Sequence, residues 1–310
     1  MSFSNYAIRR VLASISVLFL VIVASFAILH LVPGDHVEVI LAATPHDQAA
    51  SDRLRQALGL NDSLPVQLGR YVANVVQGNL GTSYVSQQPV SLIVAERLPY
   101  TLVLAGCGVL VGLVVGLPFG LVAAVRGSRV RRSDVRFNLA TSALISTPDF
   151  LLATALAFVF AVWLGILPVA GAGGPESLVL PALALGIPLA GVQARVVKAA
   201  LGDVFQQDFV RTLRSAGIRE RRLVLRNVLR NALVPVVALL GVEFARLLGG
   251  TLIVENVFAW PGMGTVIFTS ITERDLPAVQ GEILALAVVI VLVNFGVDVL
   301  TRLIDPRTSA

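Results

Sequence analysis

Long apolar segments dominate this sequence and determine the class of structure that it can form. Residues 11–31 and 98–125 contain no Asp, Glu, Lys or Arg, and about 20 apolar residues are enough for a helix to cross the hydrocarbon core of a bilayer. The chain is 56% hydrophobic and only 14% charged, whereas soluble domains carry about 25% charged residues. These values exclude a soluble enzyme, a disordered chain and a fibrous repeat, and they predict an all-α integral membrane protein.

Four further apolar segments reach the length of a span only by including charged residues or prolines. They are residues 137–164 with Asp149, 178–197 with Pro181, Pro188 and Arg195, 232–254 with Glu243 and Arg246, and 278–303 with Glu282 and Asp298. Six transmembrane helices are therefore predicted. The two prolines of the fourth segment predict a break or a kink in that helix, and broken spans often line transport paths.

The basic residues predict an orientation in the membrane. Those before the first span, between spans two and three, from 195 to 230 and at the C-terminus make up 18 of the 24 Lys and Arg residues. Because cytoplasmic loops are enriched in these residues, both termini are predicted to be cytoplasmic. The first apolar run also resembles a signal peptide, but it exceeds the usual 7–15 residues and lacks a clear small-x-small cleavage site, which favours an uncleaved span.

The segment between the first two spans, residues 33–98, is long and mostly polar, yet it contains helical periodicity. One apolar stripe consists of Leu68, Val72, Val75 and Val76 and is followed by Gly78; a shorter one contains Leu54 and Leu58. Pro89 predicts the start of another short helix that ends near Leu98. Two interpretations are open: amphipathic helices that lie on the outer membrane face, or a small folded cap on the outer ends of the spans.

The cytoplasmic segment 202–235 is basic and amphipathic. Its apolar residues recur at near-helical spacing: Phe205, Phe209, Leu213, Leu223, Leu225 and Leu229. Gly217 interrupts the pattern and favours a tight turn or a close approach of the backbone. We predict a helix, a turn at Gly217, a second short helix and re-entry into the membrane at Pro235. The alternative is a solvated basic loop that only follows the positive-inside rule.

This cytoplasmic segment also carries a family resemblance. Asp208-Phe-Val-Arg-Thr-Leu-Arg-Ser-Ala-Gly217-Ile and Leu229-Arg-Asn231-Ala-Leu-Val-Pro235 resemble the EAA signature of permease subunits in ATP-binding cassette importers. Other segments in the family's order are Leu31-Val-Pro-Gly-Asp35, Gly78-Asn-Leu-Gly-Thr-Ser83, Glu96-Arg-Leu-Pro99, Val257-Phe-Ala-Trp-Pro-Gly-Met-Gly264 and Asp305-Pro-Arg307. Together they resemble the B-type permease of dipeptide, oligopeptide or nickel importers, in the binding-protein-dependent type I family.

The resemblance implies a non-catalytic transport subunit in a bacterial plasma membrane. Its implied partners are a second homologous permease, two ATP-binding cassette ATPases, an extracytoplasmic substrate-binding protein, a peptide substrate and the lipid bilayer, with no nucleic acid. ATP and Mg²⁺ would be bound by the ATPases, and this chain would hold no cofactor or metal. The residues agree on one point: the only lysine, Lys198, precedes Ala199, so the chain has no Gly-Lys-Ser/Thr phosphate loop.

The resemblance also implies that the turn around Gly217 is a coupling helix that sits in a groove of an ATPase. The implied coupling residues are Arg211, Thr212, Arg214, Ser215, Ala216, Gly217, Ile218, Arg219, Arg221, Asn231 and Pro235. Long arginine donors suit carboxylates and carbonyls on a partner. The implied organisation is an N-terminus and first helix (1–32), an extracytoplasmic loop (33–98) and a permease core of five transmembrane helices (99–310) with its coupling loop at 202–235.

Three charged residues within the spans are candidates for the translocation path: Asp149, Glu243 and Arg246. A charge in the bilayer costs about 2.5–3.5 kcal/mol on insertion scales, so these side chains should face the bundle or a wet path. They can line a path for a zwitterionic peptide, with Asp149 or Glu243 towards its amine and Arg246 towards its carboxylate. The other interpretation is a structural Glu243–Arg246 pair, and it is favoured because neither position belongs to the recognised signature.

Competing functions remain at this level. Nickel or another small solute is an alternative cargo within the same family. A proton-coupled secondary transporter would use Asp149 and Glu243 as proton sites but would leave the basic helix–turn–helix unexplained, and an intramembrane enzyme lacks a catalytic set. The three histidines, His30, His36 and His46, do not have metal-ligand spacing. Glycines at 112, 116 and 120 predict close helix contact, either within the bundle or with a partner.

Overall fold

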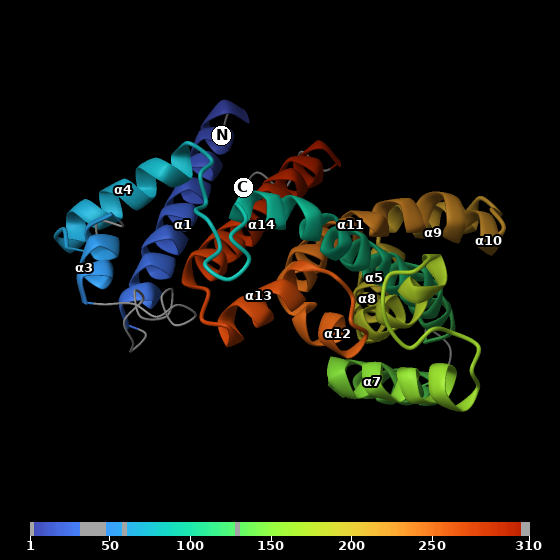
Figure 1. Cartoon of the computed structure of the whole chain (residues 1–310). Helices are drawn as coiled ribbons and strands as arrows, with labels where there is room; N and C mark the ends of the chain where they lie inside the picture. Colours follow the sequence, from blue (N-terminus) through green and yellow to red (C-terminus); the bar gives the residue numbers. More distant parts are fainter. Residues whose placement is uncertain (1–2, 32–47, 58–60, 128–130, 305–310) are drawn as a thin grey trace. The chain divides into compact units, whose positions relative to one another are not determined.

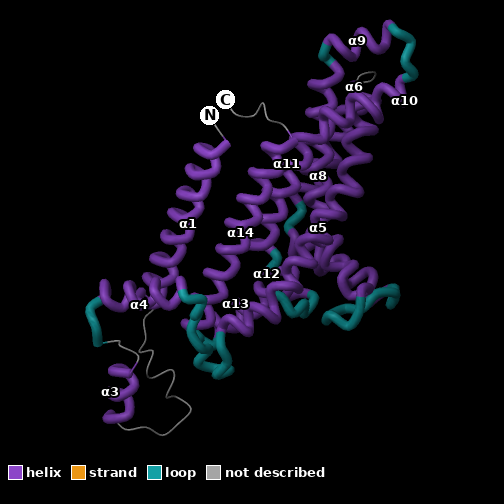
Figure 2. Tube along the Cα trace, turned by 90° about the horizontal axis from the view of Figure 1, so that it is seen from above, coloured by secondary structure: helices purple, strands orange, loops and turns teal. Residues whose placement is uncertain are grey.

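The part of the chain that the structure describes is mostly helical. The computed structural model describes residues 3–31, 48–57, 61–127 and 131–304, which contain helices and loops and no β-strand (Figure 2). In chain order the elements are α1 Phe3–Leu31, α3 Gln48–Ala57, α4 Leu64–Val76, α5 Val90–Gly127, α6 Arg131–Ser146, α7 Asp149–Leu156, η1 Ala157–Trp163, η2 Pro175–Leu178, α8 Val179–Phe205, α9 Asp208–Ser215, α10 Glu220–Arg222, η3 Leu223–Val228, α11 Leu229–Gly250, α12 Leu252–Val257, α13 Met263–Thr272 and α14 Leu276–Ile304 (Figure 1). The all-α class is confirmed.

Four helices of the described chain are long and apolar enough to cross a membrane. The candidate spans are Ile8–Ala27, Val90–Arg126, Pro175–Phe205 and Leu276–Val299. Two bent helix pairs also reach this length, which gives up to six spans when each pair counts as one.

The prediction of a short helix that ends near Leu98 is wrong. Helix α5 starts directly after Pro89 and continues through Pro99 as far as Gly127. A helix end inside apolar surroundings would leave several backbone groups unpaired, which costs more than the one hydrogen bond that Pro99 removes. The segment before the second span therefore continues into that span without a connecting loop.

The span predicted over residues 137–164 is sharply bent. Helices α6 and α7 meet at 88° across a break of a few residues, and Pro148 occupies the N-cap of α7 in an extended conformation. Proline cannot continue a helical hydrogen-bond ladder and pushes the preceding residue out of the helical region. Beyond α7 the helix widens into the π-helical turn η1. Asp149 thus becomes the first residue of α7, at the bend.

The fifth span begins with a second, gentler bend. Residues Leu223–Leu233 and Pro235–Gly250 form a 47° angle, and the bend lies at Pro235, which is inside α11. Because proline has no backbone N–H and its ring crowds the preceding turn, a kink at this position has a direct cause.

Helix α8, by contrast, is not broken. It runs continuously from Val179 to Phe205, with Pro188 in its interior. Pro181 lies in the first turn, where the missing N–H would have no helical partner. Most residues of this span, Pro188 included, are buried, so neighbouring helices stabilise it around Pro188. The break allowed by the sequence is therefore excluded.

Helix α5 packs closely on α8 through its glycine stripe. A Cβ atom at Gly116 would lie 2.7 Å from the carbonyl oxygen of Ala190, and one at Gly120 would lie 2.5 Å from that of Ala194. At Gly112 the added atom would meet the side chain of a leucine of α8. These separations leave no room for a methyl group, so the glycines serve packing within this chain.

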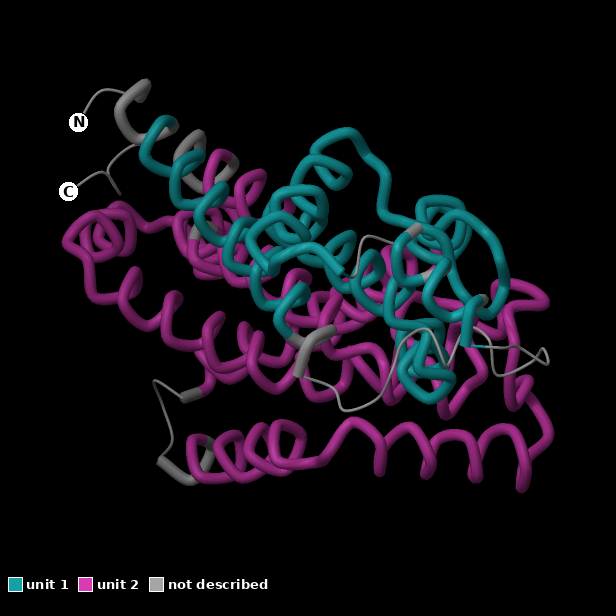
Figure 3. Tube along the Cα trace, turned by 60° about the vertical axis from the view of Figure 1, so that its left-hand side comes forward, with its two compact units in different colours: residues 1–99, 265–291 teal, residues 100–264, 292–310 magenta. Residues whose placement is uncertain are grey.

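Figure 3 shows the two compact units into which the chain divides: residues 1–99 with 265–291, and residues 100–264 with 292–310. In the first unit, α4 ends as its periodicity predicts, and Gly78 follows with a φ of +78°. Tyr71 of α4 lies 3.4 Å from the Ser25 hydroxyl of α1. Leu58 and the side chain of Leu54, the second predicted stripe, lie outside the described residues.

A buried carboxylate joins two distant segments of the first unit. Asp275, between α13 and α14, accepts hydrogen bonds from the Ser83 hydroxyl and from the backbone N–H groups of Tyr84, at 3.0 Å, and Val85, at 3.3 Å. Asp275 and Ser83 are 3% and 2% exposed. Burial, and then the charge of Asp275, raise the pKa of the Tyr84 phenol. The loop before α5 is thus held on the α13–α14 corner.

Candidate functional sites and family

The basic segment 202–235 forms a helical projection of the second unit (Figure 2). Helix α9 is amphipathic: Val210 is fully buried, while Arg211 and Thr212 are exposed. Val210 belongs to a core cluster with Leu223 of η3 and Val204 of α8. Because the apolar side is part of the core, the alternative of a solvated basic loop is excluded.

The turn between α9 and α10 is defined by Gly217. Its φ of +76° lies in the left-handed region, which favours glycine. The Gly217 N–H bonds the carbonyl of Arg214 at 3.0 Å, and the Ile218 N–H bonds that of Leu213 at 3.2 Å. This pattern is a Schellman C-cap, which commonly pairs two apolar residues across the turn. Leu213 and Ile218 fill that role here, since both pack on the same core cluster.

An ion pair spans the turn. Arg214 Nη2 lies 2.6 Å from Glu220 Oε1, and the guanidinium lies 5.7 Å from the centre of the Phe205 ring. The hydrogen bond with Glu220 raises the pKa of Arg214. Arg214 is thus engaged within the chain and is also about half-exposed. The contact with a partner that the resemblance implies for it stays a prediction.

Most of the remaining predicted coupling residues lie in α9 and the turn, whereas Asn231 and Pro235 lie in α11. The exposed ones are Arg211, Thr212, Ser215, Ala216, Arg219, Asn231 and Pro235. Gly217, Ile218, Arg219 and Arg222 line a concave surface with two residues of η3, Leu225 and Arg226. Arg222, Leu225 and Arg226 are not among the predicted coupling residues, and Leu225 is predicted only as part of the apolar stripe. Arg222 follows Arg219 by three residues, a spacing that places two side chains on one side of a helix. The side chain of Arg221 lies outside the described residues.

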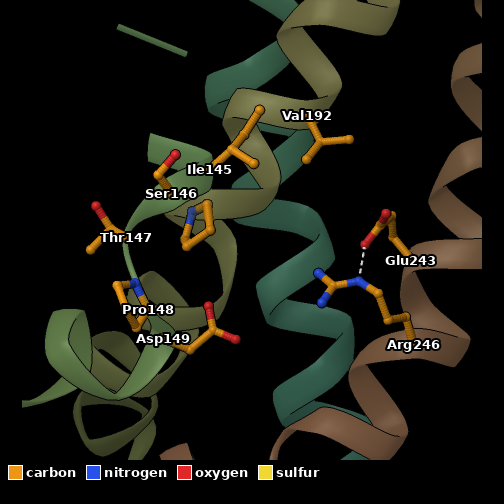
Figure 4. Close-up of a pocket in the computed structure, with 9 residues that line it drawn as sticks. Ile145, Ser146, Thr147, Pro148, Asp149, Val192, Glu243 and Arg246 are labelled. Atoms are coloured by element: carbon orange, nitrogen blue, oxygen red, sulfur yellow. Dashed lines mark hydrogen bonds and ion pairs between the residues drawn. The ribbon is translucent and has the colours of Figure 1, made fainter. Parts of the chain in front are cut away.

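The three charged candidates of the spans share one pocket (Figure 4). The cavity has a volume of about 340 Å³. Its walls come from the α6–α7 bend, α8 and α11, with the residues Ile145, Ser146, Thr147, Pro148, Asp149, Pro188, Val192, Glu243 and Arg246. Asp149 lies on one wall, whereas Glu243 and Arg246 lie on the wall formed by α11 (Figure 4).

Glu243 and Arg246 form the ion pair that their spacing predicts. Arg246 Nε lies 2.5 Å from Glu243 Oε2, and the two side chains are 53% and 11% exposed respectively. The end of the guanidinium points into the pocket, towards the wall that carries Asp149 (Figure 4). The pocket therefore presents a carboxylate and a guanidinium on facing walls.

Two prolines complete this pocket. The sequence connected Pro188 with a transport path only through a break in its helix, and it gave no such indication for Pro148. Pro148 creates the bend that brings Asp149 to the wall, and Pro188 lies on α8 beside it. Among the residues that the structure describes, no group of three His, Cys, Asp or Glu side chains is arranged to hold a metal ion. His36 and His46 are outside those residues.

Family comparison identifies the class of protein to which these sites belong. Residues 116–310 match the family described as "Binding-protein-dependent transport system inner membrane component", and residues 3–105 match the N-terminal region described for the same kind of component. The chain belongs to this permease family. It is the membrane-spanning permease subunit of an ATP-binding cassette importer, a multi-pass protein of the inner membrane, and a transport component rather than an enzyme.

Relatives match this permease along nearly its whole length. The glutathione transport system permease protein GsiC of Pectobacterium atrosepticum is 41% identical over 303 residues, which cover 97% of this chain and 98% of that protein. The protein of the same name from Escherichia coli K12 is 40% identical over 302 residues, with the same coverage. The proton-coupled transporter and the intramembrane enzyme are therefore set aside.

A solved structure supports the fold. A chain of the inward-facing MetNI methionine ABC transporter is similar with a TM-score of 0.54 and 20% identity, over 69% of this chain and 96% of that chain. At this identity the similarity concerns the fold alone.

Proposed function

We propose that this permease imports short peptides and that its translocation path passes the pocket of Asp149, Glu243 and Arg246. The observation that carries the proposal is the pocket itself, where a carboxylate and a guanidinium face one another across a cavity of about 340 Å³. Binding pockets for small molecules begin at about 300 Å³. Short peptides carry an ammonium and a carboxylate, and glutathione, the substrate named for the GsiC relatives, is a tripeptide with both groups.

We further propose that α9, the Gly217 turn and α10 couple the permease to an ATPase. The turn projects from the core on a Schellman cap and an internal ion pair. It presents Arg211 and Arg219 to a partner, and both are exposed. Closure of two ATPases around ATP would move this projection as a rigid body and tilt α8 and α11, to which it is joined.

The proposed assembly has five protein chains. This permease pairs with a second homologous permease, two ATPases that bind ATP and Mg²⁺, and an extracytoplasmic binding protein that delivers the peptide. Both termini and the segment 202–235 face the cytoplasm, in accord with the arginine distribution. In this proposal residues 33–98 are the extracytoplasmic segment, which ends with the first turns of α5, and 99–310 are the permease core.

Purification of the tagged chain from its native membrane in mild detergent tests this function. The proposal predicts a stoichiometric complex with one similar permease and ATPases, and a binding protein whose bound ligand is a peptide. A binding protein loaded with nickel or another non-peptide solute would contradict the cargo. A chain without ATPases, which transports on a proton gradient without ATP, would contradict the coupling as well.

A further inference from the structure

The two walls of the charged pocket differ in what they can offer a substrate. We infer that Asp149 binds the free ammonium of a peptide, that Arg246 binds its carboxylate, and that Glu243 is a positioning residue that aims Arg246. This inference rests on the proposed function, because it assigns the ends of the same peptide cargo. It requires the cargo to have both ends unmodified.

Arg246 has the geometry of a carboxylate ligand. Only its Nε takes part in the 2.5 Å contact with Glu243, and its side chain remains 53% exposed. The terminal nitrogens point into the pocket (Figure 4). A guanidinium oriented in this way can donate two parallel hydrogen bonds to a carboxylate, which a lysine cannot reproduce. A residue that served only the ion pair would not need to extend into the cavity.

Glu243 is placed differently from the other two residues. Its side chain is only 11% exposed, and Oε2 accepts the Arg246 hydrogen bond. A buried carboxylate next to a guanidinium fixes the orientation of that guanidinium, and removal of one partner leaves the other uncompensated. Glu243 therefore acts on the substrate through Arg246, which resolves the choice between Asp149 and Glu243 as the amine ligand.

Asp149 is separated from the ion pair and available to a cation. It is the first residue of α7, directly after the bend at Pro148, and it is partly exposed. In the described chain no ion pair within 4.0 Å joins it to Arg246, although Arg246 acts on it electrostatically. The space between the two groups is the cavity. An ammonium and a carboxylate on one molecule would satisfy both walls at once.

The location supports a transport role. Charged side chains within spans are costly and commonly mark substrate pathways, and discontinuous helices commonly line substrate sites in transporters. Here the bend of the third span supplies Asp149, while Pro188 of α8 lines the same cavity. Charged side chains within the spans and a discontinuous helix therefore occur at the same cavity.

The experiment measures equilibrium binding of radiolabelled glutathione to the complete importer in nanodiscs, without the binding protein. Competitors are N-acetylglutathione, which lacks the ammonium, and glutathione diamide, which lacks both carboxylates. We expect each competitor to bind wild type at least about tenfold more weakly than glutathione, since a hydrogen bond to a charged group is lost. In Asp149→Asn, N-acetylglutathione should bind as well as glutathione, and glutathione diamide should still bind more weakly. In Arg246→Gln, glutathione diamide should bind as well as glutathione, and N-acetylglutathione should still bind more weakly.

The positioning role of Glu243 has its own test. Glu243→Gln should weaken the preference for ligands with carboxylates and leave the preference for a free amine intact. Glu243→Asp, which keeps the charge, should retain more of the carboxylate preference than Glu243→Gln does. The double exchange Glu243→Arg with Arg246→Glu keeps an ion pair but turns a carboxylate into the cavity. We expect an intact complex, by gel filtration with its ATPases, that does not bind glutathione. Restored binding would show that the pair is only structural and would overturn the inference.

The outcomes separate this inference from the proposed function. If wild type takes up glutathione with ATP and a binding protein, yet binds it equally in Asp149→Asn and Arg246→Gln, the inference fails and the function stands. If wild type neither binds glutathione nor takes up any peptide, the proposed function fails, and the inference fails with it.

Discussion

Arg214 and Glu220 form an ion pair of 2.6 Å that closes the turn at Gly217. Since both side chains are about half-exposed, the pair contributes at most about 1 kcal/mol to stability. Its expected role is to fix the shape of the turn. We predict that Arg214→Glu lowers the ATPase stimulation caused by loaded binding protein, and that the exchange Arg214→Glu with Glu220→Arg restores it. Arg211→Glu, in which the altered residue points outward, should not be rescued by Glu220→Arg. Equal behaviour of both arginine variants would contradict this role.

Gly217→Asp should abolish transport while the protein remains folded in the membrane. No atom lies within 4 Å of a Cβ at this position, so the added side chain fits. The φ of +76° adds about 1–2 kcal/mol of strain. Loss of transport would therefore come from the new acidic side chain, which would project towards the ATPase that this turn is proposed to contact. Gly78→Asp is the matched control, because Gly78 also has a positive φ and open space. Retained uptake in Gly217→Asp at normal expression would contradict the coupling assignment.

Gly116→Ala should destabilise the permease by about 1–3 kcal/mol, the usual cost of overpacking. The new methyl would lie 2.7 Å from the carbonyl oxygen of Ala190 and from Cβ of Gln193, so α5 and α8 must separate. Thermal unfolding in detergent measures the effect. Gly249→Ala has nothing within 4 Å and should not lower the unfolding temperature. Equal temperatures for the two variants would mean that the glycine stripe does not hold these helices together.

Asp275→Ala should release the loop that precedes α5. The change leaves the N–H groups of Tyr84 and Val85 without their acceptor, and an unpaired buried group costs about 1–3 kcal/mol. Hydrogen exchange of these two amides should accelerate. The comparison is Asp62→Ala, which removes an exposed pair with Arg70 and should leave the amides unchanged. Unaltered exchange in Asp275→Ala would contradict the anchoring role.

Local sequence signals were sufficient to predict the helix end at Gly78 and the turn at Gly217. The stripe that ends before Gly78 and the glycine at 217 predict a helix end and a turn, because positive φ favours glycine whatever the tertiary context. Arg214 shows the limit of this reasoning. Its exposure to a partner or its pairing with Glu220 depends on the backbone conformation of the five residues between them, 215–219, and residue type alone does not determine it.

Prolines in the spans show where tertiary packing decides. Pro188 lies inside an unbroken helix, whereas Pro148 stands at an 88° bend. Each proline lacks the backbone N–H that a continuous helix would use at its position. The effects differ through the neighbours, because α8 is mostly buried among other helices. The pocket exists because the third span bends at Pro148 while α8 continues through Pro188. The sequence identified its three charged residues but not the bend that brings Asp149 opposite Arg246.

The most direct test of the central claim is ATP hydrolysis by the reconstituted complex of this permease, its partner permease and the ATPases in nanodiscs, with and without loaded binding protein. The account predicts that loaded binding protein stimulates hydrolysis in wild type and in Gly78→Asp. Gly217→Asp should assemble but give no stimulation. Equal stimulation in wild type and Gly217→Asp would contradict the claim that this turn transmits ATP hydrolysis to the translocation path.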